Sequence, residues 1–269
     1  MASPPPQPPV LTGRSGRLKQ ARRLVRRRSR TEAGLFLAEG AKALTEALSV
    51  DGNVVEVFAT PEAHADLAGL RDAAPGVPWH LVDPDGLATL AGAVTPQGVV
   101  AVCRVLDVPL AEVVATSGDL VVCADVRDPG NAGTVIRTAD ASGATGVVLA
   151  GHSVDPYNDK TVRATVGSLW HLPVALAPDP ADVVATVRAA GRTVLAADGA
   201  GEVDLFAAEA DGLLDRPVAW LLGNEAWGLP DDLAALADHR VAIPIRGRAE
   251  SLNLATAAAV CLYATARRR

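Results

Sequence analysis

Three segments in the second half of the chain place polar side chains directly after apolar runs. They read DPGNAGTVIRTA at 128–139, LLGNEAWGLP at 221–230 and IPIRGRAESLNLATAAA at 243–259. Five side chains in these segments are candidates for chemistry: Asn131, Arg137, Glu225, Ser251 and Asn253. Their amide, guanidinium, carboxylate and hydroxyl groups can donate or accept hydrogen bonds, and the guanidinium is suited to hold a phosphate. No histidine stands in the three segments.

The first segment predicts a turn that leads into a helix. Gly130 and Gly133 allow the backbone to turn sharply, and Asn131 is expected to cap the helix. Arg137 then falls about two turns into that helix, roughly 9 Å along the axis from Asn131. The helix dipole disfavours a cation close to the start of a helix, and a bound phosphate would account for the presence of Arg137 there. An ordinary exposed arginine is the alternative.

The second and third segments predict a turn and a helix start. Glu225 is expected in a turn beside glycines, where Gly223 would let the backbone approach a ligand. Trp227 would pack over that ligand, and a place in the core or in an interface is the alternative. Ser251 and Asn253 stand at the start of a helix, where capping is their ordinary role, more readily for Ser251 than for Asn253.

The length and composition of the chain indicate an α/β protein of two domains. At 269 residues the chain can bury two separate cores. Hydrophobic residues make up 49% of it and aromatic residues only 3%, which predicts cores of Ala, Val and Leu. No uncharged apolar run of about 18 residues is present, so no membrane partner is expected. The first residues lack the pattern of a secretory signal.

The cysteines and histidines predict neither a disulfide nor a metal site. Cys103, Cys123 and Cys261 stand apart within apolar runs, which indicates buried, reduced thiols and a cytoplasmic protein. The five histidines are scattered without the spacing of metal ligands, so no metal is expected.

The charges are strongly segregated along the chain. The formal net charge is −6, yet the first 30 residues contain nine basic and no acidic residues. Affinity for a polyanion depends on clustered charge rather than on the total, so this run favours contact with nucleic acid. A solvated basic helix without a partner is the alternative interpretation.

The order of apolar and polar stretches predicts the domain organisation. Residues 1–13 are rich in proline and are predicted to be disordered. Short strands and helices then indicate a domain at 14–106, which begins with a basic helix, and 107–116 are expected to be a linker. In 117–269 apolar strands alternate with helices, as in a parallel sheet covered on both faces. Ligands of such sheets lie outside the carboxyl ends of the strands, where all three polar segments fall.

The three segments, in this order and spacing, resemble the signature motifs of the TrmH/SpoU family of RNA ribose 2′-O-methyltransferases, within the SPOUT superfamily. The stretch TPQGVVAV at 95–102 also resembles that family's interdomain region. The resemblance implies an α/β fold whose C-terminal parallel-sheet domain contains a deep trefoil knot. It also implies a smaller N-terminal α/β domain that binds RNA, a homodimer formed through the C-terminal domain, and S-adenosylmethionine as the cofactor.

The resemblance assigns roles to individual residues. The catalytic set would be Arg137, Asn131, Glu225, Ser251 and Asn253, and the cofactor would be held by Gly223, Ile243, Leu252, Ala197 and Asn253. Apart from the resemblance, the clustered charge of the N-terminal run and the polar segment near 160 indicate RNA-binding residues, with an ordinary exposed loop as the alternative for the segment near 160. These residues are Arg14, Arg17, Lys19, Arg22, Arg23, Arg26, Lys160 and Arg163. Because a guanidinium is very costly to deprotonate, Arg137 is expected to position phosphate and hydroxyl, and its role as the base stays open.

The reaction expected from the resemblance is transfer of a methyl group from S-adenosylmethionine to a ribose 2′-hydroxyl of structured RNA. Ribosomal RNA is the expected substrate, with transfer RNA as the alternative. A non-catalytic RNA-binding protein of the same fold is a further alternative. An ordinary doubly wound enzyme with a nucleotide cofactor would also place glycines after a strand. Neither a G-x-G-x-x-G motif after a strand nor a P-loop is present, which disfavours that last interpretation.

Overall fold

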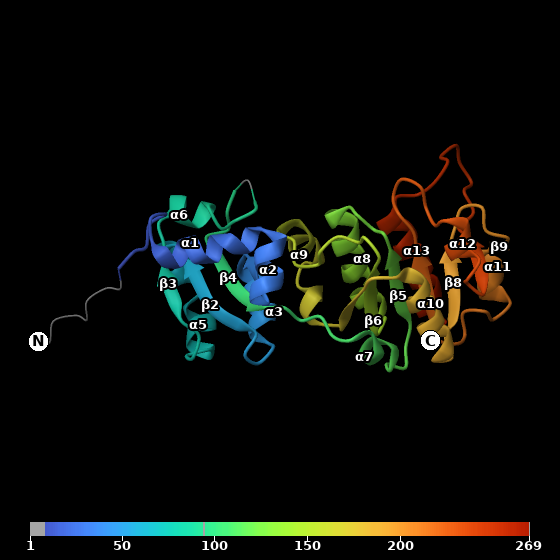
Figure 1. Cartoon of the computed structure of the whole chain (residues 1–269), viewed down its shortest axis with the longest axis horizontal. Coiled ribbons are helices and arrows are strands. Elements are labelled where there is room, and N and C mark those ends of the chain that lie inside the picture. The colour runs from blue at the N-terminus through green and yellow to red at the C-terminus, as the bar shows by residue number, and fades with distance from the viewer. Residues whose placement is uncertain (1–8, 94, 269) are drawn as a thin grey trace, which may run out of the picture. The chain divides into compact units, whose positions relative to one another are not determined.

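The computed structural model describes residues 9–93 and 95–268, and the chain divides into two compact units. The first unit holds the chain as far as Val105 together with Tyr157–Gly167, and the second holds Leu106–Pro156 and Ser168–Arg269 (Figure 1). The segment Tyr157–Gly167 therefore packs with the first unit, although it lies inside the sequence that was expected to form the second domain.

The first unit is built on a mixed sheet of four strands in the order β1-β4-β2-β3. Its strands are β1 Leu35–Glu39, β2 Val54–Ala59, β3 Trp79–Leu81 and β4 Val99–Arg104. β1 and β2 pair with β4 in antiparallel orientation, and β3 pairs with β2 in parallel. Its helices are α1 Gly16–Arg22, η1 Arg23–Val25, α2 Arg27–Ala33, α3 Ala41–Leu48, α4 Pro61–Asp66, α5 Ala68–Ala73, α6 Pro84–Ala88 and α9 Asp159–Thr165. The expected smaller α/β domain at the N-terminal end is confirmed.

The basic run is a packed layer of this unit. Leu18, Ala21 and Leu24 are buried in one apolar cluster with residues of the sheet, such as Val100. The basic side chains between them point outward because these three positions recur with helical spacing. α1 continues directly into η1, and the run is broken before α2 because Arg26 takes an extended conformation.

The described part of the proline-rich N-terminal segment is hydrogen-bonded to the first unit. The backbone N–H of Leu11 donates to the carbonyl of Leu81 at 2.7 Å, and that of Asp83 donates to the carbonyl of Leu11 at 2.9 Å. The part of the predicted disordered tail from 9 to 13 therefore includes a β-bridge between Leu11 and Val82. Residues 1–8 lie outside the described residues.

The second unit contains a seven-stranded sheet in which every pairing is parallel, in the order β7-β6-β5-β10-β8-β11-β9. Its strands are β5 Leu120–Ala124, β6 Gly146–Ala150, β7 Val174–Ala177, β8 Thr193–Ala197, β9 Val203–Asp204, β10 Val218–Leu222 and β11 His239–Ala242. Its helices are α7 Leu110–Val114, α8 Pro129–Ser142, η2 Ser168–Trp170, α10 Pro180–Ala189, α11 Leu205–Ala210, α12 Asp231–Ala234 and α13 Leu254–Ala266. The parallel sheet expected from the apolar strands is confirmed.

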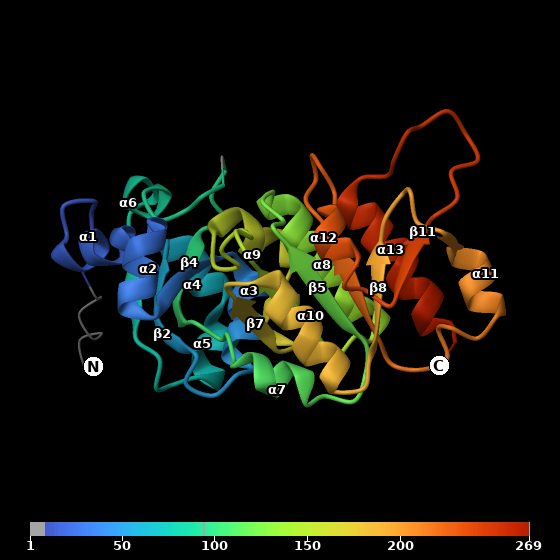
Figure 2. The same ribbon diagram turned by 45° about the vertical axis from the view of Figure 1, so that its right-hand side comes forward.

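Helices cover both faces of this sheet. α7 and α10 pack on one face, where Val113 and Val184 are buried against strand residues such as Val122. α8 and α13 pack against the strands and against each other (Figure 2). The segment 107–116, expected to be a linker, contains α7. Val113 is fully buried because it completes the apolar core beneath β5 and β6.

Helix α13 is tied to the central strand by a buried hydrogen bond. The indole Nε1–H of Trp220 in β10 donates to the hydroxyl of Thr265 at 2.9 Å, and both residues are fully buried. An indole N–H is a donor that must be satisfied when the ring is buried. The opposite side of α13 is less covered, since Tyr263 is 53% exposed in the single chain.

Candidate active site

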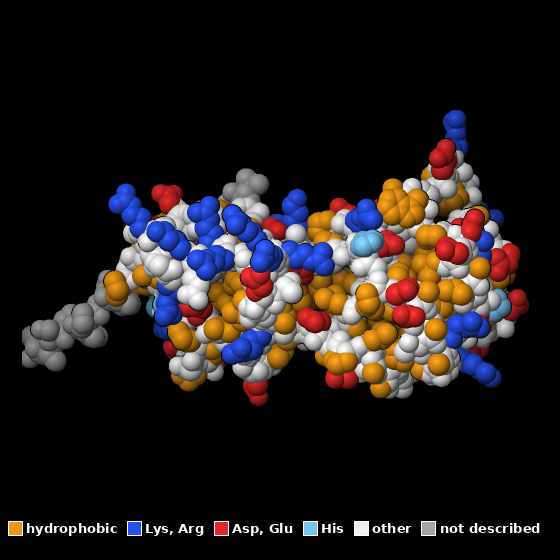
Figure 3. All heavy atoms as spheres, viewed as in Figure 1, with side chains coloured by type: hydrophobic (Ala, Val, Ile, Leu, Met, Phe, Trp, Pro, Cys, Tyr) orange, Lys and Arg blue, Asp and Glu red, His pale blue; other side chains and the backbone are white. Residues whose placement is uncertain are grey.

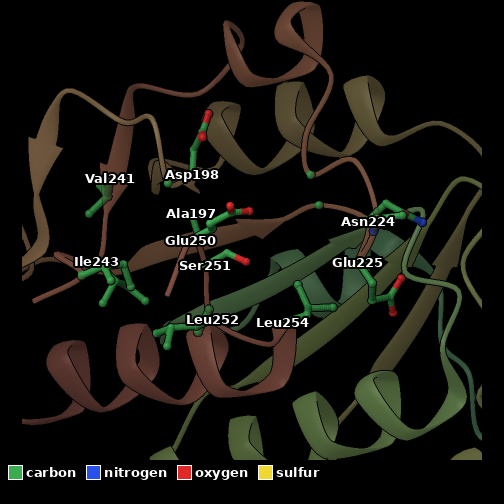
Figure 4. Close-up of a pocket in the computed structure, with 16 residues that line it drawn as sticks. Ala197, Asp198, Asn224, Glu225, Val241, Ile243, Glu250, Ser251, Leu252 and Leu254 are labelled. Carbon is green, nitrogen blue, oxygen red and sulfur yellow. Dashed lines mark hydrogen bonds between the residues drawn. The ribbon is translucent and has the colours of Figure 1, made fainter. Parts of the chain in front are cut away.

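A cavity of about 320 Å³ lies at the carboxyl ends of the parallel strands of the second unit. Ala197 ends β8, Gly223 follows β10, and Ile243 follows β11, while Ser251 and Leu252 belong to the loop before α13. Figure 4 shows Ile243 and Glu225 on opposite sides of this cavity, with Ser251 between them. Its volume falls within the range of sites for small ligands, about 300–1,000 Å³.

The residues predicted to hold a cofactor gather at this cavity with one exception. Ala197, Gly223, Ile243 and Leu252 all line it. Asn253 is not a lining residue, and its side chain is used in the hydrogen bonds described next. These residues are scattered through the sequence, and the parallel sheet unites them because the carboxyl ends of its strands lie at one edge.

Hydrogen bonds join the three polar segments. The carboxylate of Glu225 accepts from the backbone N–H groups of Arg127 at 3.1 Å and Asp128 at 3.0 Å. It also accepts from Nδ2 of Asn131 at 3.3 Å. The Oδ1 atom of Asn131 in turn accepts from Nδ2 of Asn253 at 3.0 Å. Three of the five predicted catalytic residues thus form one network, which we call the Glu225 network: Glu225, Asn131 and Asn253.

Glu225 stands on a tight hairpin formed by 224–228. The backbone groups of Asn224 and Gly228 exchange two hydrogen bonds of 2.9 Å. The buried side chain of Asn224 donates to the carbonyl of Asp125 at 2.7 Å and accepts from the N–H of Ala226 at 2.8 Å. A Cβ atom on Gly223 would lie 2.3 Å from the carbonyl carbon of Gly228. Glycine is therefore required at 223 for the hairpin to fold back on itself, a reason that sequence analysis did not identify.

The helix caps differ from those expected. Asp128 caps α8, because its Oδ1 accepts from the N–H of Asn131 at 2.8 Å and Pro129 occupies the first helical position. Asn131 lies inside the first turn, which leaves its side chain for the Glu225 network. Asn253 caps α13 by accepting from the N–H groups of the two residues after Leu254, at 2.9 and 3.3 Å. Ser251 is not the cap and lies exposed beside the cavity.

Arg137 is separate from the Glu225 network in the single chain. It is exposed on α8, and among the described residues it has no hydrogen-bond or ion-pair partner. Arg137 lies six positions after Asn131, and at 3.6 residues per turn this offset places the two side chains about 120° apart around the helix axis. The structure therefore brings together four of the five predicted catalytic residues, with Ser251 at the cavity, and leaves Arg137 on another side of the helix.

The cavity is acidic. Asp198, Glu225 and Glu250 line it, and the lining contains no Lys, Arg or His among the residues that the structure describes. Burial opposes ionisation of Asp198. Hydrogen bonds from the Ala200 backbone and the Arg240 guanidinium, together with the charge of Arg240, outweigh burial and lower the pKa of this carboxyl. Glu250 was missed by sequence analysis, although a carboxylate directly before Ser251 was the available signal.

The cysteines do not contribute a nucleophile. Burial raises the pKa of the Cys103 thiol, and it raises the pKa of Cys261 to about 12. Burial, together with the negative charge of Glu225, raises the pKa of Cys123 to about 12. Within the described part of the chain, no group of His, Cys, Asp or Glu is placed to hold a metal ion. In the same part of the chain, no helix has the length and apolar character to cross a membrane.

The predicted RNA-binding side chains fall into two groups, both in the first unit. One group is exposed and has no ion-pair partner among the described residues: Arg14, Lys19, Arg22, Arg23, Arg26 and Lys160. Figure 3 shows Lys and Arg side chains gathered over α1 and α2. The other group is paired within the unit. Arg17 contacts Glu56 at 2.9 Å, and Arg163 contacts Asp159 at 3.1 Å and the buried Glu39 at 3.4 Å.

The chain is similar to known methyltransferases over nearly its whole length. It is 32% identical over 257 residues to the 23S rRNA (guanosine(2553)-2′-O)-methyltransferase RlmP of Bacillus subtilis, which covers 94% of this chain and 97% of that protein. Its fold is similar to that of an AdoMet-bound rRNA methyltransferase from Sinorhizobium meliloti, with a TM-score of 0.83 and 36% identity. That alignment covers 96% of this chain and 98% of the other. The SpoU methyltransferase AviRb from Streptomyces viridochromogenes, in complex with AdoMet, matches with a TM-score of 0.82 and 32% identity, covering 94% and 98% of the two chains.

Two family assignments divide the chain between them. Residues 16–101 match the MRM3-like substrate binding domain, and residues 119–263 match the SpoU rRNA Methylase family. The second match contains all three polar segments, so the resemblance inferred from those motifs is confirmed. With these matches and the similarity to RlmP along nearly the full length, the chain belongs to the SpoU rRNA Methylase family.

Proposed function

We propose that this protein transfers a methyl group from S-adenosylmethionine to a ribose 2′-hydroxyl of ribosomal RNA. The observation that carries the proposal is the Glu225 network beside an acidic cavity at the carboxyl ends of the sheet. Relatives named as rRNA 2′-O-methyltransferases and a solved rRNA methyltransferase with AdoMet bound support the choice of reaction, substrate and cofactor.

The cavity suits this cofactor in charge and in surface. S-adenosylmethionine has an apolar adenine face and a positively charged sulfonium. Ile243 and Leu252 offer apolar surface to the adenine. Among the three carboxylates, Asp198 is already neutralised by Arg240 and Glu225 accepts three hydrogen bonds. Glu250 is exposed at the cavity and has no hydrogen-bond or ion-pair partner among the described residues, so it is the carboxylate left to face a cationic ligand.

The residues of the site would orient the reacting hydroxyl. When bound, S-adenosylmethionine supplies an electrophilic methyl group, and transfer requires a hydroxyl oxygen in line with it. The three donors on Glu225 fix the positions of Asn131 and Asn253, so that the ribose meets a rigid polar surface. Ser251 offers a hydroxyl beside the cavity. Arg137, which is exposed and has no partner in the described part of the chain, would bind the phosphate next to the target ribose.

Calorimetry with three ligands and mapping of ribose methylation test the proposal. We expect the protein to bind S-adenosylmethionine and neither NAD nor ATP. We also expect one or more ribosomal 2′-O-methyl groups to disappear from total RNA when the protein is absent. Binding of NAD or ATP instead would indicate an ordinary nucleotide-cofactor enzyme. A site lost from transfer RNA alone would identify the other substrate class, and cofactor binding without any methylated RNA would indicate a non-catalytic protein.

The remaining features expected from the family belong to this proposal. We infer a homodimer formed through the C-terminal domain, for which the exposed Tyr263 on α13 leaves an uncovered surface. Three buried thiols with raised pKa values suit a reducing compartment such as the cytoplasm. The trefoil knot stays a prediction from the resemblance, as do the domain limits 14–106 and 117–269. Sedimentation analysis of the full chain tests the dimer, because a monomer at micromolar concentration would contradict it.

A further inference from the structure

Trp227 is an exposed tryptophan in a chain that has few aromatic residues. The sequence contains four tryptophans, and aromatic residues are 3% of the whole. Trp220 is fully buried and Trp170 is 8% exposed, whereas Trp227 is 54% exposed. An exposed ring of this size offers a large, rigid apolar surface that a ligand can cover.

The ring stands at the edge of the proposed active site. Trp227 belongs to the 224–228 hairpin, and its neighbours Ala226 and Gly228 line the cavity while Trp227 itself does not. Two residues before it, Glu225 forms the Glu225 network. Two backbone hydrogen bonds between Asn224 and Gly228 close the hairpin, and the Asn224 side chain fixes it to the carbonyl of Asp125. Trp227 therefore stands on a backbone that these bonds and the Glu225 network hold in place.

Arg127 lies against the same ring. Its guanidinium carbon is 5.1 Å from the centroid of the Trp227 ring, within the distance of a cation–π contact. The backbone N–H of Arg127 also donates to Glu225. Trp227 is thus linked to Glu225 through the hairpin, and Arg127 is linked to it through its backbone N–H. The exposed surface of the Trp227 ring remains available to a ligand.

We propose that Trp227, with Arg127, forms a stacking subsite for an unpaired base of the RNA next to the ribose that is methylated. This inference rests on the proposed function. Single-stranded RNA is recognised by stacking of bases on exposed aromatic rings and by arginine contacts to phosphates. With the Arg127 guanidinium over the Trp227 ring, the pair offers an exposed planar π surface to a base and a cation to its phosphate. A bulged or looped nucleotide is the substrate class selected, because a base inside a helix cannot reach a ring fixed on a rigid hairpin.

The variant Trp227→Ala tests the subsite, with Trp227→Phe and Phe206→Ala as comparisons. Phe206 is 51% exposed on α11 and does not line the cavity, so it matches the exposure of Trp227 away from the site. For methylation of the mapped RNA we expect Trp227→Ala to lower kcat/KM about 10- to 100-fold, mainly through KM. Trp227→Phe should retain most of the wild-type value, and Phe206→Ala should equal the wild type. The Kd for S-adenosylmethionine, measured by calorimetry, should not change in any variant.

A direct readout uses a fragment of the mapped RNA in which 2-aminopurine replaces a base beside the methylated nucleotide. We expect its fluorescence to be quenched on binding the wild type and the quenching to be lost with Trp227→Ala. Wild-type kcat/KM and unchanged quenching in Trp227→Ala would overturn the subsite while leaving the proposed function intact. Loss of S-adenosylmethionine binding in this variant would also overturn it, since Trp227 would then serve the fold of the hairpin. If the wild type methylates no RNA at all, the proposed function itself fails.

Discussion

Glu225 illustrates how a single carboxylate can organise a site built from distant segments. Its two oxygens accept hydrogen bonds from Arg127, Asp128 and Asn131, and through Asn131 it is linked to Asn253 at the start of α13. A carboxylate with this many donors is an orienting group rather than a free base. Arg137 is the opposite case, since it is exposed and has no partner among the described residues. The residues of the site thus separate into a preformed network and an exposed arginine, which we propose to contact the RNA.

Replacing Arg137 by Lys should abolish most methyl transfer and leave S-adenosylmethionine binding unchanged. A lysine keeps the charge but not the planar, forked set of donors that can hold a phosphate and a hydroxyl together. Turnover on RNA and calorimetry with the cofactor measure the two effects separately. Near wild-type turnover in the variant would contradict the positioning role of Arg137.

Replacing Glu225 by Gln should lower kcat about 100-fold. The amide keeps one acceptor, but its NH₂ group faces backbone N–H donors, so Asn131 and the start of α8 lose their fixed positions. Glu112→Gln, at an exposed carboxylate on α7, removes the same charge away from the site and should have no effect. Equal kcat values for both variants would show that the Glu225 network does not serve the reaction.

At the scale of elements, the site depends on where strands and helices end. β8, β10 and β11 deliver Ala197, Gly223 and Ile243 to one edge because all three strands run parallel. α8 and α13 begin at that edge, capped by Asp128 and Asn253. The packing of α13 on β10 therefore holds the third polar segment next to the second.

Replacing Thr265 by Val should destabilise the protein by about 1–3 kcal/mol. The variant keeps the side-chain volume but leaves the indole N–H of Trp220 buried without an acceptor. Urea denaturation measures the free energy of unfolding. Thr265→Ser, which keeps the hydroxyl, should lower this free energy less than Thr265→Val does. A Val variant as stable as the wild type would mean that this hydrogen bond does not hold α13 to the sheet.

At the scale of the whole molecule, charge and chemistry are divided between two units. The chain has a net charge of −6, yet exposed cations gather on α1 and α2 of the first unit. The second unit carries an acidic cavity suited to a cationic cofactor. Under the proposed function, this division would let an acidic protein bind a polyanion, because local clusters and not the total charge release counterions.

Replacing four exposed cations by Gln should weaken RNA binding and flatten its salt dependence. The four are Arg14, Lys19, Arg22 and Arg26, which have no ion-pair partner among the described residues. For every phosphate that is no longer neutralised, the slope of log K against log salt should fall by about 0.7–0.9. Deletion of residues 1–30 would not test the charge alone, because it would also remove Leu18 and Leu24 from the apolar core of the first unit.

The control for this measurement is Arg188→Gln in the second unit. Arg188 is paired with Asp238 at 2.8 Å, so its charge is already compensated. The Arg188→Gln variant should therefore show the same slope of log K against log salt as the wild type. If the fourfold variant also shows the wild-type slope, the basic run makes no phosphate contacts.

The sequence by itself determined the α/β class and the parallel sheet, because apolar runs of strand length are a local signal that needs no knowledge of long-range contacts. The methyltransferase family followed from the resemblance of three polar motifs to those of a known family. That resemblance supplied four of the residues that line the cavity, Ala197, Gly223, Ile243 and Leu252, and did not supply Glu250. The basic run was recognised as a local excess of charge.

Only the tertiary structure decided which partner each polar side chain takes. Asn131 joins Glu225 because Asp128 already caps α8, and Asn253 caps α13 in place of Ser251. Tyr157–Gly167 joins the first unit, where Arg163 reaches Glu39 across more than a hundred residues of sequence. Packing decides which of several nearby donors and acceptors form a hydrogen bond. The periodicity of the sequence does not specify these partners.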